Sequence, residues 1–205
     1  MANPFTVNGS CLLAMAGKNC VAIASDRRLG MQMQTISTKF QKIFQVNDRN
    51  FIGLAGLATD IQTVREELRF QVNLLELREE HPIEPPKFAA LVKSLLYEHR
   101  FGPYFISPVI AGLTSDNKPF IATSDSIGAF SFPTNFAVSG TADDCLYGIC
   151  ESLWREDLDE EELFRVTAAC LQAAQERDGG SGWGGIVHII TPEKIITKEL
   201  KVRMD

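Results

Sequence analysis

The sequence predicts an α+β protein, a four-layer αββα sandwich in which two antiparallel sheets lie between two pairs of helices. Its composition is typical of a globular domain, with 45% hydrophobic and 22% charged residues. Strand-like segments come first, then two helices, strands again, two more helices and two final strands. Helices in consecutive pairs can cover the outer faces of a sheet pair, whereas a doubly wound parallel sheet would alternate single strands and helices.

The first part of the chain predicts strands. Apolar residues 11–16 and 21–25 are separated by a Gly-Lys-Asn turn at 17–19, and residues 40–46 and 51–55 form a second pair. The apolar run of 21–25 stops at Asp26, which places a carboxylate at a strand end.

Helical spacing begins after this region. Ile61, Val64, Leu68, Val72 and Leu75 recur at helical intervals, and residues 59–62 fit a capping box. A second helix places an apolar face on residues 88–96, after Pro85-Pro86 and before Gly102-Pro103.

Strands return at 109–113, 120–124 and 136–139. A third helix follows with Asp143 and Asp144 in its first turn, and a fourth begins at about Asp159. Two last strands are predicted at 186–190 and 195–202. We expect one domain over 10–205, preceded by a short leader at 1–9.

Charge and cysteine spacing exclude several function classes. The net charge is −6 and no basic stripe is present, so nucleic acid is not an expected partner. The start of the chain lacks the pattern of a secretory signal, and no apolar stretch is long enough to span a membrane. The cysteines show no CxxC pair and no histidine at zinc-ligand spacing, so we expect buried reduced thiols, no metal and no cofactor: Cys11, Cys20, Cys145, Cys150 and Cys170.

Four residues are candidates for chemistry. Asp26 and Lys42 lie in or at the end of strand-like segments, where an ionisable group is expected to have either a charged or hydrogen-bonding partner or a functional role. Asp178 and Ser181 belong to a glycine-rich run at 178–185, which lacks the order of a phosphate-binding loop. The spacing of these four residues is compatible with two roles. They could take part in catalysis, or they could be structural, with a salt bridge and a turn.

Several motifs resemble the beta subunits of the 20S proteasome. They occur in the expected order over essentially the whole chain: GSCLLAM at 9–15, VAIASDRR at 21–28, FQKI at 40–43, GLAG at 53–56 and RDGGSG at 177–182. Further segments, FGPY at 101–104 and CESLW at 150–154 among them, resemble one non-catalytic type of beta subunit in particular.

The resemblance implies an N-terminal nucleophile mechanism. In this family a propeptide is removed after a glycine, and the exposed threonine attacks with its hydroxyl while its own α-amine accepts the proton. A free α-amine titrates near about 7.7–8.0 and can serve as a base, and a nearby ammonium lowers that pKa. Lys42 matches that ammonium, Asp26 its partner, and Asp178 and Ser181 the positions that orient the amine and the hydroxyl.

This sequence departs from the family pattern at the nucleophile. Position 10, sixteen residues before Asp26, holds Ser10 instead of threonine, and Thr141 stands where catalytic members carry serine. We therefore expect a non-catalytic structural subunit in which Ser10, Asp26, Lys42, Thr141, Asp178 and Ser181 are vestigial. The alternatives are an active peptidase that uses Ser10 after removal of the leader, and a sandwich-fold hydrolase outside any ring.

The resemblance also implies partners and a place in the cell. We expect other beta and alpha subunits in four stacked seven-membered rings, unfolded polypeptides as substrates of the chamber, and a cytoplasmic and nuclear location. Asp125 follows the predicted strand 120–124, and the matching loop in the family completes the substrate pocket of the neighbouring subunit. A turn-capping role for Asp125 is the alternative.

Overall fold

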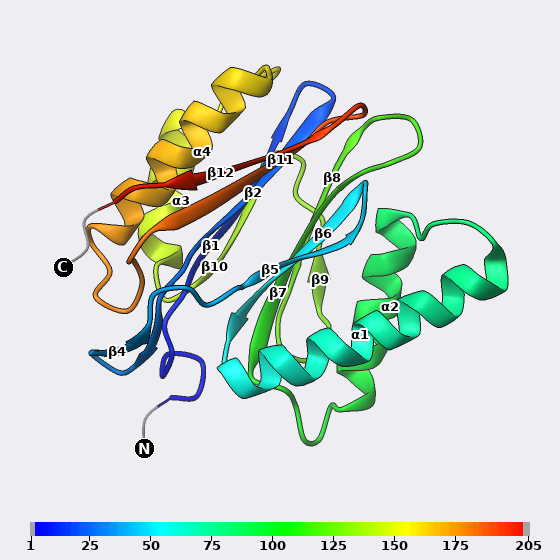
Figure 1. Ribbon diagram of the computed structural model, residues 1–205, viewed down its shortest axis with the longest axis horizontal. Coiled ribbons are helices and arrows are strands. Elements are labelled where there is room, and N and C mark those ends of the chain that lie inside the picture. The colour runs from blue at the N-terminus through cyan, green and yellow to red at the C-terminus, as the bar shows by residue number, and fades with distance from the viewer. Residues whose placement is uncertain (1–2, 203–205) are drawn as a thin grey trace.

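Two antiparallel five-stranded sheets form the centre of the computed structural model, which describes residues 3–202 (Figure 1). Residues 1–2 of the predicted leader and 203–205 of the predicted domain lie outside the described residues. The strands are β1 (Cys11–Gly17), β2 (Cys20–Asp26), β3 (Leu29–Met31), β4 (Gln34–Ser37), β5 (Ile43–Asn47), β6 (Asn50–Gly56), β7 (Ile106–Leu113), β8 (Pro119–Ser124), β9 (Phe130–Ser131), β10 (Phe136–Gly140), β11 (Gly185–Ile190) and β12 (Ile195–Leu200).

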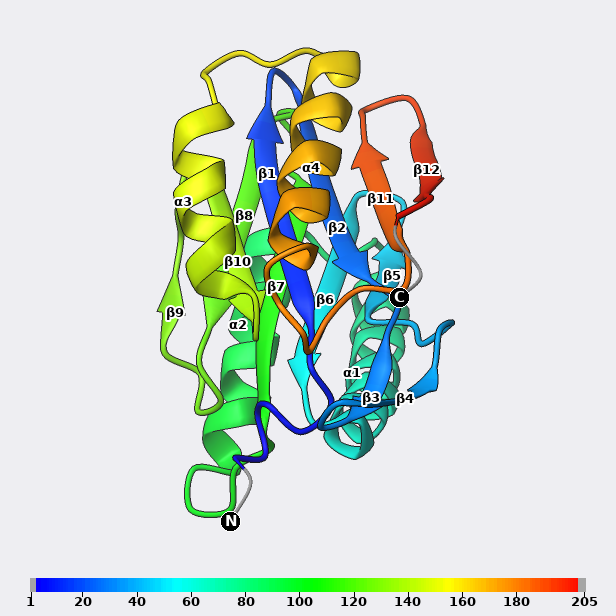
Figure 2. The same cartoon turned by 90° about the vertical axis from the view of Figure 1, so that its left-hand side faces the viewer.

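The order of the strands separates two sheets with different helix partners. One sheet runs β10-β1-β2-β11-β12 and is covered by α3 (Asp143–Leu153) and α4 (Glu160–Gln175). The other runs β5-β6-β7-β8-β9 and is covered by α1 (Ala58–Glu79) and α2 (Pro85–Glu98). Figure 2 shows α3 and α4 in front of the first sheet, with α1 and α2 on the far side. The predicted four-layer αββα sandwich is confirmed.

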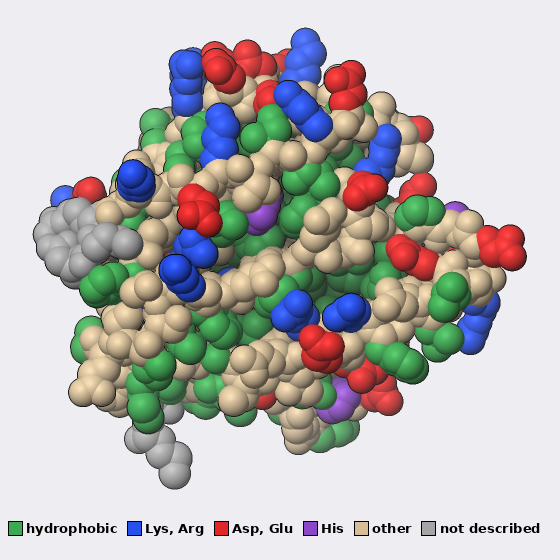
Figure 3. Space-filling model, in the orientation of Figure 1, with side chains coloured by type: hydrophobic (Ala, Val, Ile, Leu, Met, Phe, Trp, Pro, Cys, Tyr) green, Lys and Arg blue, Asp and Glu red, His purple; other side chains and the backbone are tan. Residues whose placement is uncertain are grey.

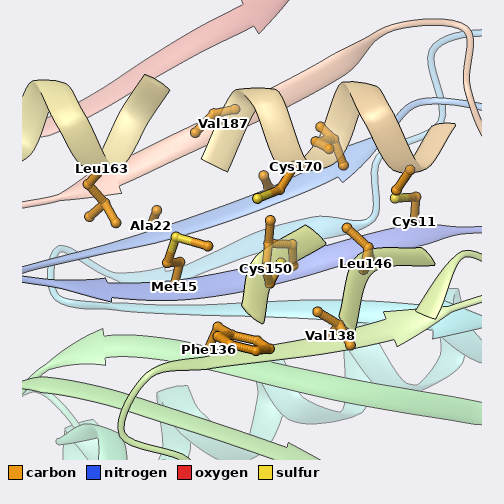
Figure 4. Close-up of a cluster of buried hydrophobic side chains, with 14 of the residues drawn as sticks. Cys11, Met15, Ala22, Phe136, Val138, Leu146, Cys150, Leu163, Cys170 and Val187 are labelled. Atoms are coloured by element: carbon orange, nitrogen blue, oxygen red, sulfur yellow. The ribbon is translucent and has the colours of Figure 1, made fainter. Parts of the chain in front are cut away.

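Three apolar clusters hold the four layers together. Strand β1 is buried on both faces: Leu13 and Met15 point toward α3 and α4, while Leu12 and Ala14 point into the space between the sheets. This alternation follows from the two-residue period of a strand. Figure 4 shows the first of these clusters, where side chains from β1, β2, β10 and β11 meet those of the helices. The sequence of a strand that is buried on both faces is a continuous run of apolar residues, as it is at 11–16.

The cysteines lie as the sequence predicts, with one exception. Cys11, Cys20, Cys150 and Cys170 are free and buried, whereas Cys145 is half-buried. Burial raises the pKa of the Cys11 thiol and raises the pKa of Cys20 to about 11. These two thiols therefore stay protonated and unreactive at neutral pH.

The start of α1 differs from the prediction. The helix begins at Ala58 with Leu57 at the N-cap position, and that residue supplies no side-chain hydrogen bond. The predicted capping box at 59–62 is therefore wrong, because Thr59 already lies inside the first turn. The Ala58 N–H is instead bound by Asn8 Oδ1, at 2.9 Å, from a segment fifty residues earlier in the chain.

Two further parts of the structure were not predicted. The hairpin β3–β4 lies outside both large sheets, and β9 is a two-residue strand at the edge of the second sheet. Within residues 3–202, no helix has the length and apolar character needed to cross a membrane.

Candidate functional site

A buried ion pair joins the end of β2 to the segment before β5. Lys42 Nζ lies 2.6 Å from Asp26 Oδ1, and the two side chains are 2% and 0% exposed. Asp26 Oδ1 also accepts the Cys11 N–H at 2.9 Å, and Asp26 Oδ2 accepts the N–H groups of Arg28 and Gly182 at 3.2 Å each. Because a buried carboxylate needs such partners, Asp26 fixes the start of β1 and the glycine-rich loop relative to β2.

The Lys42 ammonium also contacts the peptide bond that precedes Ser10. Lys42 Nζ donates to Gly9 O at 3.0 Å, and the Ser10 N–H donates to Thr141 Oγ1 at 3.1 Å. Ser10 Oγ is buried and has no hydrogen-bond partner among residues 3–202. The Ser10 N–H therefore serves as a hydrogen-bond donor, and no side chain of the described residues contacts the hydroxyl as a base.

The Asp178 carboxylate accepts hydrogen bonds from the hydroxyl groups of Thr141 and Ser181. Its Oδ2 accepts from Thr141 Oγ1 and from Ser181 Oγ, each at 2.7 Å, while Oδ1 accepts the Gly180 N–H at 2.9 Å. Hydrogen bonds thus run from the Ser10 N–H through the Thr141 hydroxyl to the Asp178 carboxylate. The six residues predicted as vestigial site positions lie together in one connected network, and their assignment as vestigial remains a prediction.

Arg28 is a member of this network that the sequence reasoning missed. Its guanidinium is buried, has no carboxylate partner among residues 3–202, and donates to Gly180 O at 2.7 Å, Gln32 O at 2.9 Å and Thr35 Oγ1 at 3.0 Å. It therefore holds the glycine-rich loop against the β3–β4 hairpin. Its position two residues after the end of a buried strand is the signal in the sequence that could have identified Arg28 as part of the network.

The segment before Ser10 is part of the fold. Val7 O accepts the Gln32 N–H at 2.9 Å, and Asn8 O accepts the Gly30 N–H at 3.2 Å, so this segment pairs with the hairpin. The Asn8 side chain joins the hairpin to α1, since Nδ2 donates to Gly30 O at 2.8 Å and Oδ1 accepts from Ala58. In Figure 1 the N-terminal segment lies between β4 and the start of α1.

We expect Asn8→Ala to lower the free energy of unfolding by about 1 kcal/mol, because Asn8 Oδ1 accepts a helix-terminal N–H as the side chain of an N-cap residue would. Asn8→Asp should have a smaller effect, because it keeps the acceptor for the Ala58 N–H and adds a charge that the helix dipole favours. Urea denaturation of the two variants measures the difference. Equal losses would mean that the bond to Gly30, and not the cap, carries the stabilisation.

A cleft of about 480 Å³ lies beside this network and contains the predicted pocket residue Asp125. Gly56, Ser139 and Thr141 line the cleft together with Phe5 from the N-terminal segment. Asp125 is exposed, and its Oδ1 accepts the N–H groups of residues 127 and 129 at 3.0 and 2.8 Å. Its turn-capping role is therefore present, and Asp125 has no direct bond to the buried network.

The fold and this constellation define the class of protein. An αββα sandwich that carries a hydroxyl residue at the start of β1, beside a Lys–Asp pair and an Asp–Ser pair, has the arrangement of an N-terminal nucleophile hydrolase. Within residues 3–202, no group of three or more His, Cys, Asp or Glu side chains could hold a metal ion.

Comparison with known proteins gives the family. A family model described as "Proteasome subunit" matches residues 6–190. The chain is 54% identical over 201 residues to "Proteasome subunit beta type-3" of Picea mariana and 55% identical over 201 residues to "Proteasome subunit beta type-3-A" of Arabidopsis thaliana, in each case covering 98% of both chains. It is 52% identical over 199 residues to the Drosophila melanogaster protein "Proteasome subunit beta type-3", covering 97% of both chains.

The chain therefore belongs to the proteasome subunit family. The resemblance inferred from the sequence motifs is confirmed, including the segments that point to one particular type of beta subunit. Membership of this family implies assembly with other proteasome subunits.

Proposed function

We propose that the chain is a non-catalytic structural subunit of the beta type-3 kind, which builds the beta ring of a 20S proteasome and lines its chamber. The observation that carries the proposal is the residue at the nucleophile position. Ser10 stands there in place of the threonine that the family mechanism uses, and its buried hydroxyl has no hydrogen-bond partner among the described residues. The relatives reported above are named as beta type-3 subunits, which supports the same role.

The anchoring of the N-terminal segment supports the same proposal. Release of residues before Ser10 would remove the bond from Asn8 to the first turn of α1 and the pairing of Val7 with Gln32. The segment before Ser10 therefore stabilises the folded subunit that assembles into the ring.

We expect the Gly9–Ser10 bond to remain intact in assembled particles. N-terminal sequencing or intact mass analysis of the subunit from purified particles should find a start before Gly9. A uniform start at Ser10 would favour the alternative, an active peptidase with Ser10 as nucleophile. A variant checks the chemistry: Ser10→Ala removes a hydroxyl that makes no hydrogen bond within residues 3–202, so peptidase rates per particle should stay unchanged.

The partners in this proposal are the other beta and alpha subunits in four stacked seven-membered rings, with unfolded polypeptide as the substrate of the chamber. A cytoplasmic and nuclear location is part of the same proposal, and fluorescence microscopy of a tagged chain tests it. Migration of the tagged chain with the other subunits on a native gel tests the assembly. A free chain under conditions where the particle is intact would contradict it.

Asp125 has a proposed role in the specificity of a neighbouring subunit. Its Oδ1 is bound within its own turn, whereas its carboxylate charge lies at the exposed rim of the cleft. A carboxylate at this position would favour a basic side chain before the cleaved bond.

The variant Asp125→Asn isolates that charge, because asparagine keeps the Oδ1 acceptor for the turn. We expect cleavage after Arg or Lys by assembled particles to fall, while cleavage after acidic and apolar residues stays the same. Separate substrates for the three specificities measure this. Equal rates for variant and parent would leave Asp125 as a turn residue only.

A further inference from the structure

A groove of about 420 Å³ runs between β5 and α1, away from the network around Ser10. Its volume lies within the range of roughly 300–1,000 Å³ that is usual for ligand sites. In Figure 3, which shows this face, two basic side chains (blue) lie beside apolar surface (green) in the region over β5 and α1, with an acidic side chain (red) next to them. The apolar residues that line the groove are Phe44, Val46, Ile52, Leu68, Val72 and Phe88.

The strand that borders the groove has an unpaired edge. β5 is the outermost strand of its sheet, and the Leu54 N–H donates to Lys42 O at 2.8 Å. Since backbone groups of an antiparallel strand alternate in direction, residues 42 and 44 face β6, while Ile43 and Gln45 face outward. The edge is therefore available to pair with another extended chain.

A glutamine side chain occupies an outward carbonyl of this edge, since Gln41 Nε2 donates to Ile43 O at 2.8 Å. Gln45 Nε2 donates to Asn47 O at 3.3 Å and to Asp48 Oδ1 at 3.4 Å, beyond the register shift that follows Gln45. Both glutamines are exposed and line the groove, so they can rotate away when a partner strand supplies donors of its own. No other residue among those described pairs with the outer edge of β5.

The charges of the groove are all of one sign. Arg65 and Arg69 of α1 line it, and no acidic residue is among its described lining residues, although the whole chain carries a net charge of −6. The Arg65 guanidinium lies over the Phe44 ring at 4.7 Å, and its nearest carboxylate contact is with exposed Glu66 at 3.9 Å. Arg69 forms no ion pair or side-chain hydrogen bond within residues 3–202. Within the described residues Arg69 is therefore unpaired and Arg65 has only this long contact with an exposed carboxylate, so both can receive the carboxylate of a ligand.

We propose that this groove binds an extended acidic segment of another polypeptide chain, which adds a strand to the outer edge of β5. Side chains on one face of a strand are two residues apart. The side chains that face α1 would then place an apolar group over the floor of the groove and, two residues along, a carboxylate between Arg65 and Arg69. This inference goes beyond the structural role proposed above and does not depend on whether Ser10 is catalytic.

Fluorescence anisotropy with the full-length chain tests the proposal. The probe is an acetylated, fluorescein-labelled heptapeptide that carries Leu and Glu two residues apart among Ser and Thr. We expect saturable binding that weakens as salt is added, and at least about tenfold weaker binding of the peptide with Gln in place of Glu. The double variant Arg65→Gln/Arg69→Gln should bind the Glu peptide as weakly as the parent binds the Gln peptide, and should not distinguish the two peptides.

Two controls separate the groove from general effects of charge and folding. Arg78→Gln removes an exposed arginine of the same helix that does not line the groove, so it should leave binding unchanged. Gln45→Pro removes the outward N–H of the edge, a position at which proline is tolerated because no bond to β6 is lost. It should abolish binding while circular dichroism and the melting temperature show a folded chain.

Three results would overturn the proposal. These are no binding by the folded parent at up to about 1 mM peptide, equal binding of the Glu and Gln peptides, and unchanged binding by folded Gln45→Pro. Self-association of the parent in sedimentation analysis, lost in the double arginine variant, would mean that a second copy of this chain occupies the groove instead.

Discussion

Replacing Lys42 by alanine should lower the free energy of unfolding by about 3–5 kcal/mol, because removal of one partner of a buried ion pair leaves the other charge uncompensated. Lys42 is the only cation that contacts Asp26 among the described residues, at 2.6 Å, and both side chains are almost fully buried. The lysine also binds Gly9 O, so the segment before Ser10 loses a contact as well. Urea denaturation followed by circular dichroism measures the loss.

A nearby lysine provides the matched control for this variant. Lys39 is exposed and forms no ion pair within residues 3–202, so Lys39→Ala should change the free energy of unfolding by less than about 0.5 kcal/mol. In cells, Lys42→Ala should lower the yield of assembled particles and leave peptidase activity per particle unchanged. Normal assembly together with a lost peptidase activity would show instead that Lys42 serves catalysis.

Gly9→Ala should lower the free energy of unfolding by about 2–4 kcal/mol, the sum of a left-handed backbone and a steric overlap. Gly9 has φ +68°, which side chains other than glycine adopt at a cost. A Cβ at this position would lie 1.8 Å from Gly180 O, a backbone atom of the glycine-rich loop. That loop cannot move freely, because Arg28 also binds Gly180 O.

Gly148 is the control for this substitution. It lies on the exposed face of α3 and a Cβ there would meet no atom within 4 Å. Gly148→Ala should therefore stabilise the chain by about 0.5–1 kcal/mol, the helix-propensity difference between the two residues. If Gly9→Ala proves as stable as the parent in thermal denaturation, the close packing of Gly9 against the loop is not a requirement of the fold.

Much of this architecture could be predicted because its signals are local. The strands and helices of the core follow two-residue and helical periodicities. The fourth helix was predicted to begin at about Asp159, and Asp159 is its N-cap, with Oδ1 accepting the Glu162 N–H at 2.8 Å. Asp26, Lys42 and Asp178 could be singled out because ionisable groups at strand ends and in glycine-rich turns are rarely without a partner.

The features that the sequence did not predict depend on contacts between segments that are distant along the chain. The first N–H of α1 donates to Asn8 Oδ1, and no rule that considers only residues 57–62 can find an acceptor fifty positions earlier. The hairpin β3–β4 was missed although Leu29, Met31 and Met33 alternate with other residues, because its strands have only three and four residues and Met31 and Met33 are exposed instead of packed in a core. Its stability comes instead from Arg28 and from pairing with Val7 and Asn8.

The strand order of the first sheet has a consequence for the chain as it leaves the ribosome. β1 and β2 lie at the centre of that sheet, yet their outer neighbours β10 and β11 are encoded far downstream. At roughly 5–20 residues per second, the stretch from Asp26 to Phe136 takes on the order of 10 s to synthesise. During that time a hairpin that is apolar on both faces has two open edges, a form prone to pair with other nascent chains. Early synthesis of this subunit should therefore be the stage at which it depends most on chaperones.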